Sequence, residues 1–85
     1  MSQFFEYEFT GRKPSVMQVL KQVEQGLKSS PEMMTISWGE NWLQLIKLWN
    51  GAYQGNGWIK GISGYDIATD LNRKQHNSTM NLWNT

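Results

Sequence analysis

The chain begins with a segment in which aromatic and acidic residues alternate. Residues 4–9 read FFEYEF, which places three aromatic residues on one side of an extended chain and Phe4 with two glutamates, Glu6 and Glu8, on the other. A period of two among β-forming residues is typical of a half-buried strand. Gly11 and Pro14 follow and end this predicted strand.

The next segment, from Ser15 onward, has the periodicity of a helix. Apolar residues recur along one stripe: Val16, Leu20, Val23 and Leu27. Spacing of three to four residues predicts an amphipathic helix. Ser15 and Gln18 have the spacing of a capping box, in which each side chain binds the backbone of the other residue. Pro31 prevents the helix from continuing beyond Ser30.

Two apolar runs, MMTISW and NWLQLIKLW, flank Gly39-Glu40 and predict a β-hairpin. A two-residue turn would pair Ile36 with Leu43, and a three-residue turn would set Ile36 against Gln44. We favour the two-residue turn because it keeps the apolar residues on one face.

A second turn is predicted at Asn50-Gly51, a pair that suits a two-residue type I′ hairpin. In this register Tyr53 points to the outer face, and Trp49 and Trp58 point to the helix side with Trp38. The following segment, residues 52–62, is rich in glycine and is either a strand or a loop.

A second helix is predicted to begin near Gly64, after Ser63. The element order is therefore β-α-β-β-β-α. It predicts a small two-layer α+β domain over residues 1–76, with a mostly antiparallel sheet and both helices on one face. Residues 77–85 form a polar tail that is frayed or docks on a partner through its apolar residues: Met80, Leu82 and Trp83.

The strand through residues 42–49 is apolar on both sides, which a lone two-layer domain cannot cover. Its outer residues, together with Tyr53, form the predicted interaction face: Trp42, Ile46, Leu48 and Tyr53. Exposed apolar patches of this kind mark protein-binding surfaces. We expect this face to bind a second copy of the chain, giving a homodimer, or another protein.

Composition argues mainly by exclusion. The 85 residues include no cysteine and one histidine, His76, which lies in the polar tail. Metal and nucleophile sites need histidine or cysteine on a rigid frame. No apolar run is long enough to span a membrane, and the first residues do not have the pattern of a signal peptide. The sequence therefore predicts a cytoplasmic protein that is not an enzyme and has no catalytic, metal or cofactor site.

Nucleic-acid binding is the alternative function, through sheet aromatics flanked by Lys47 and Lys60. Residues 15–75 are similar in element order to double-stranded-RNA-binding domains. That family places a lysine cluster at the start of its last helix, where this chain has Gly64-Tyr65-Asp66. A net charge of +1 also gives little electrostatic affinity for phosphates. The leading hypothesis is a small intracellular interaction or regulatory module of the inhibitor, immunity or accessory type.

Overall fold

The computed structural model describes residues 3–83, with side chains described for residues 3–75. The elements along the chain are β1 (Phe4–Phe9), α1 (Val16–Leu27), β2 (Met33–Trp38), β3 (Asn41–Lys47), β4 (Tyr53–Ile59), β5 (Ile62–Ser63) and α2 (Gly64–Trp83). The predicted α+β class is confirmed, and most of residues 52–62 form strands, β4 and the start of β5, joined by a turn at Lys60-Gly61. The short strand β5 is the one addition to the predicted order.

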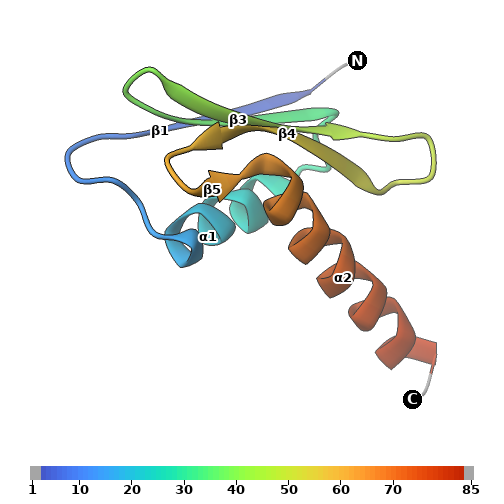
Figure 1. Cartoon of the computed structure of the whole chain (residues 1–85). Helices are drawn as coiled ribbons and strands as arrows, with labels where there is room; N and C mark the ends of the chain where they lie inside the picture. The colour runs from blue at the N-terminus through green and yellow to red at the C-terminus, as the bar shows by residue number, and fades with distance from the viewer. Residues whose placement is uncertain (1–2, 84–85) are drawn as a thin grey trace.

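The strands form a single sheet in the order β1-β2-β3-β4-β5. β1 runs parallel to β2, because α1 returns the chain to the same end of the sheet, and all other neighbouring strands are antiparallel. Both helices lie on one side of this sheet (Figure 1). The molecule is therefore a two-layer domain with one helix-covered face, as the sequence predicted.

The capping box predicted for α1 is present. The Ser15 hydroxyl accepts a hydrogen bond from the Gln18 N–H at 3.2 Å, and the Gln18 side chain accepts one from the Ser15 N–H at 2.8 Å. Near the end of the helix, a β-carbon on Gly26 would overlap the ring of Phe5. Glycine weakens a helix but here allows α1 to pack closely over β1.

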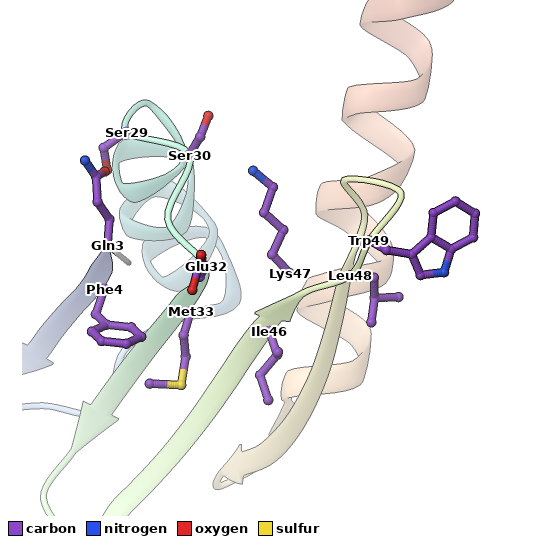
Figure 2. Close-up of a pocket in the computed structure, with 10 residues that line it drawn as sticks. All are labelled: Gln3, Phe4, Ser29, Ser30, Glu32, Met33, Ile46, Lys47, Leu48 and Trp49. Atoms are coloured by element: carbon purple, nitrogen blue, oxygen red, sulfur yellow. The ribbon is translucent and has the colours of Figure 1, made fainter. Parts of the chain in front are cut away.

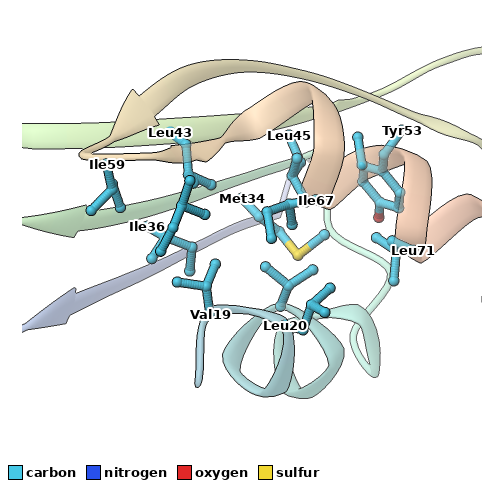
Figure 3. Close-up of a cluster of buried hydrophobic side chains, with 13 residues drawn as sticks. Val19, Leu20, Met34, Ile36, Leu43, Leu45, Tyr53, Ile59, Ile67 and Leu71 are labelled. Carbon is cyan, nitrogen blue, oxygen red and sulfur yellow. The ribbon is translucent and has the colours of Figure 1, made fainter. Parts of the chain in front are cut away.

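The β2–β3 hairpin has the predicted two-residue turn. Ile36 lies opposite Leu43, and Gly39 takes a φ of +61°, a conformation that glycine adopts without strain. The core lies between the sheet and the two helices (Figure 3). Its buried side chains are all apolar or aromatic: Val19, Leu20, Val23, Met34, Ile36, Leu43, Leu45, Tyr53, Ile59, Ile62, Ile67, Ala68 and Leu71.

Helix α2 begins at Gly64, where the sequence predicted it. The N–H of Asp66 is capped by the Ser63 hydroxyl at 3.4 Å. The helix continues to Trp83, and the division of the chain at residue 76 stays a prediction. The side chains of the tail, which were predicted to dock on a partner, lie outside the described ones, and their role stays a prediction.

Candidate functional site

The face of the sheet opposite the helices, called the outer face below, carries no packed element among the described residues (Figure 1). The strand register places its side chains in cross-strand rows from β1 to β4: Phe4, Met33, Ile46 and Gln54; Glu6, Thr35, Gln44 and Asn56; Glu8, Ser37, Trp42 and Trp58. The sheet therefore presents a broad surface whose composition can be compared row by row.

Large apolar side chains occupy both ends of the outer face, and a polar row separates them. At one end Trp42 lies directly opposite Trp58, with 49% and 58% of their surfaces exposed. At the other end Phe4 is 63% exposed and Ile46 is 40% exposed. Exposed tryptophan pairs are uncommon on a surface that faces only water, and tryptophan is enriched among residues that dominate binding energy.

Trp58 reaches the outer face because the β3–β4 turn is one residue longer than predicted. The loop is Trp49-Asn50-Gly51, closed by hydrogen bonds from the Leu48 N–H to the Ala52 carbonyl at 2.7 Å and from the Gly51 N–H to the Leu48 carbonyl at 3.0 Å. Gly51 has a φ of +89°, as the last residue of a three-residue hairpin loop requires. A shift of one residue turns every side chain of β4 to the opposite face.

The predicted position of Tyr53 on the interaction face is therefore wrong. Tyr53 is 3% exposed and lies in the core, where its hydroxyl donates a hydrogen bond to the Pro31 carbonyl at 2.6 Å. Burial raises the pKa of this hydroxyl above its usual value. The same shift moves Trp58 outward. Trp49, also predicted to point to the helix side, is 97% exposed at the loop.

The remaining predicted positions agree with the structure. Trp42, Ile46 and Leu48 are exposed, although their role in binding is a separate question. Trp38 lies on the helix side, half-buried, and its indole N–H donates to the Gly11 carbonyl at 2.9 Å. Phe4 and Trp58 belong to the outer face but were absent from the predicted set. The alternation of residues 4–9 already placed Phe4 on the face opposite Phe5, Tyr7 and Phe9, whereas the position of Trp58 depended on the β3–β4 turn.

A hollow lies where one end of the outer face meets the α1–β2 connection and the β3–β4 loop (Figure 2). Its volume is about 730 Å³. Phe4, Met33, Ile46 and Leu48 supply its apolar part, and Lys47 rises beside the α1–β2 connection. This open hollow extends the apolar end of the outer face.

The two lysines of the nucleic-acid hypothesis do not lie on the outer face. Lys47 is opposite the buried Tyr53 and therefore alternates toward the helix side of the sheet. The Lys60 ammonium lies 5.6 Å from the centre of the Trp38 ring, also a helix-side residue. The charged residues on the outer face are Glu6 and Glu8, which repel phosphates. The two lysines therefore do not flank the aromatic residues of the outer face, and nucleic-acid binding stays a prediction without that support.

The described residues can also be compared with the requirements of a metal site. Within that part of the chain, no group of three or more histidine, cysteine, aspartate or glutamate side chains is placed to hold a metal ion. Across residues 3–83, neither helix combines the length and apolar character needed to cross a lipid bilayer. The outer face is therefore the strongest candidate functional surface of the described chain.

Comparisons with protein-family models, with curated proteins and with solved structures found no significant match to this chain.

Proposed function

We propose that this chain is a small protein-interaction module that binds a partner protein through its outer face. The observation that carries the proposal is the uncovered Trp42–Trp58 pair, which lies on the outer face of the sheet with further apolar residues at the opposite end. Burial of such side chains in an interface releases water from a large rigid area at a low cost in side-chain entropy. A module of this kind acts by occupying a surface of its partner.

The charge on the outer face favours a particular kind of partner. Glu6 and Glu8 are both exposed, and no lysine or arginine lies in the described cross-strand rows of the outer face. A second copy of the chain, placed face to face, brings no cation to neutralise these carboxylates. Complementary potentials speed association and select the partner. We therefore propose a different protein whose contacting surface combines apolar and basic side chains.

The test is a pair of matched tryptophan substitutions. Trp42→Ser and Trp58→Ser remove aromatic area from the outer face, and Trp49→Ser removes a more exposed tryptophan from the β3–β4 loop. Proteins captured by the wild-type chain from source-cell extract are identified, purified and titrated against each variant. We expect the outer-face variants to weaken binding by at least about 2 kcal/mol each, and Trp49→Ser to have a much smaller effect.

Circular dichroism and sedimentation accompany the titration. The proposal predicts that all three variants keep the helix content of the wild type, because none of the three side chains is buried. Equal affinity of the purified partner for all variants would overturn it, as would unfolding of Trp42→Ser. If sedimentation shows that the wild type forms a homodimer and that Trp42→Ser is a monomer, the outer face binds a second copy of the chain and not a different protein.

A further inference from the structure

The two edges of the sheet differ in how their backbone groups are used. β5 pairs with the end of β4, and α2 covers the rest of the β4 edge. β1 forms the other edge, and among the described residues β2 is its sole strand partner. An uncovered edge strand exposes a row of N–H and C=O groups that can pair with another chain.

The direction of these groups follows from the hydrogen bonds at the start of β1. The carbonyl of Gln3 accepts from the N–H of Glu32 at 2.9 Å, so it points toward β2. Backbone groups of successive residues in a strand point to opposite sides. The N–H and C=O groups of Phe4, Glu6 and Glu8 therefore point to the open edge, in register for a further strand.

The side chains of the same residues restrict which strand can be added. Glu6 and Glu8 lie two residues apart on the outer face, and neither takes part in the ion pairs seen among the described side chains. A hollow of about 300 Å³ adjoins them, lined also by the hydroxyl residues Thr35 and Ser37. The outer face next to the open edge of β1 is therefore polar and acidic at Glu6 and Glu8.

Self-pairing of β1 is disfavoured by these carboxylates. Residues that lie opposite each other in antiparallel strands share one face of the sheet. If the β1 strands of two copies pair antiparallel with Glu6 as the central residue, the two Glu6 carboxylates therefore lie opposite each other. Centring on Tyr7 places Glu6 opposite Glu8 of the other copy. Like charges directly opposite are destabilising, and opposite charges stabilise such pairs.

We propose that the open edge of β1 receives an extended segment of the partner protein as an additional strand, with basic side chains at alternate positions over Glu6 and Glu8. This mode rests on the proposed function and specifies the partner's chemistry. Main-chain hydrogen bonds to the edge supply affinity, and the glutamates supply selectivity. The added strand would extend the sheet next to the apolar end that contains Phe4.

The direct test uses a synthetic nine-residue peptide of alternating lysine and threonine, followed by amide hydrogen exchange in NMR spectra. In the free protein, the N–H groups of Glu6 and Glu8 should exchange faster than that of Tyr7, which points toward β2. Saturating peptide should slow exchange at Glu6 and Glu8 and leave Tyr7 little changed. Unchanged exchange at both glutamates would overturn the proposed strand addition.

Two control peptides separate strand pairing from simple charge attraction. The first has the same residues but carries N-methyl groups on alternate backbone nitrogens, which removes the donors that would pair with β1. The second replaces lysine by glutamate. The proposal predicts that both bind much more weakly than the parent peptide, and equal binding of the N-methylated peptide would overturn it.

Variants of the protein complete the test. Glu6→Gln with Glu8→Gln should weaken peptide binding by about 2- to 30-fold, the range for loss of two cross-strand ion pairs. The matched control, Glu40→Gln with Asp66→Asn, removes two exposed carboxylates elsewhere and should change affinity less. Equal losses in the two double variants would contradict a specific edge site.

The same variants distinguish this inference from the proposed function. If the identified partner loses affinity for Trp42→Ser but binds the Glu6→Gln, Glu8→Gln variant as tightly as the wild type, the outer face binds protein and the edge does not. If the partner is insensitive to Trp42→Ser, the proposed function itself fails.

Discussion

The edges of the sheet show two solutions to the same problem of unpaired backbone groups. At the β4 edge, the side chain of Asn72 in α2 accepts from the Tyr53 N–H at 2.9 Å and donates to the Tyr53 carbonyl at 2.8 Å. One asparagine thus replaces a neighbouring strand at this point. At the β1 edge, no element of the described chain provides such partners, and glutamates border the open groups.

The difference between the two edges lies in how closely a helix approaches the strand. α2 satisfies backbone groups of β4 because it lies very close to that strand. A β-carbon on Gly55 of β4 would overlap the carbonyl of Gly64, the first residue of α2, and a β-carbon on Gly64 would overlap the backbone of Asn56. Two glycines in contact make this approach possible. β1 has no glycine. α1 contacts the helix-side face of β1, where Gly26 packs against the ring of Phe5, and does not lie along the β1 edge.

The largest expected effect comes from breaking the closed edge at Gly55. Gly55→Val forces the start of α2 away from β4, because the clash is with backbone that cannot rotate aside. We expect a loss of about 3 kcal/mol or more in the free energy of unfolding, measured by urea denaturation. Asn56→Val, whose side chain lies on the outer face, is the control and should change stability by about 0.5 kcal/mol or less. Similar losses in both variants would contradict close packing as the cause.

A smaller loss is expected when the asparagine cap is removed. Asn72→Leu keeps a similar size but leaves the N–H and C=O of Tyr53 without their partners, which should cost about 2 kcal/mol. Amide exchange at Tyr53 should become faster than in the wild type, making this part of the β4 edge resemble the β1 edge. Unchanged exchange at Tyr53 would show that Asn72 does not close the edge.

The smallest effect concerns the Tyr53 hydroxyl and depends on pH. Burial raises the pKa of this group above its ordinary value of 10.0, so the folded chain holds its proton more tightly than the unfolded chain. The resulting stability is fully present below pH 10 and is lost as pH rises through the folded-state pKa. Tyr53→Phe should cost about 1 kcal/mol at pH 7 through loss of the bond to Pro31. The stability difference between the two proteins should shrink above pH 10, and a constant difference would contradict this assignment.

Local interactions made much of the fold predictable from the sequence. The capping box at Ser15, the helical stripe of α1 and the start of α2 involve residues within one or two turns of each other. The β2–β3 register was predictable because only a two-residue turn at Gly39-Glu40 gathers the apolar residues on one face. The exposed positions of Trp42 and Ile46 followed directly from that register.

The β3–β4 register could not be obtained in the same way. Asn50-Gly51 suits a two-residue turn and also the end of a three-residue loop, and the glycine-rich strand that follows has a weak pattern of alternation. The choice exchanges Tyr53 and Trp58 between the faces of the sheet. Burial of Tyr53 against Pro31, and its contact with Asn72, join residues far apart in the chain, so they leave no local signal.

The sequence by itself determined the class of fold, the helix boundaries at their N-terminal ends and the excess of apolar surface on β3, because periodicity and capping act over a few residues. Only the tertiary structure decided which tryptophans share the outer face, which edge is closed and where the lysines lie. Those outcomes depend on a single-residue register and on two glycines that let α2 reach β4, and both are settled by packing between distant segments.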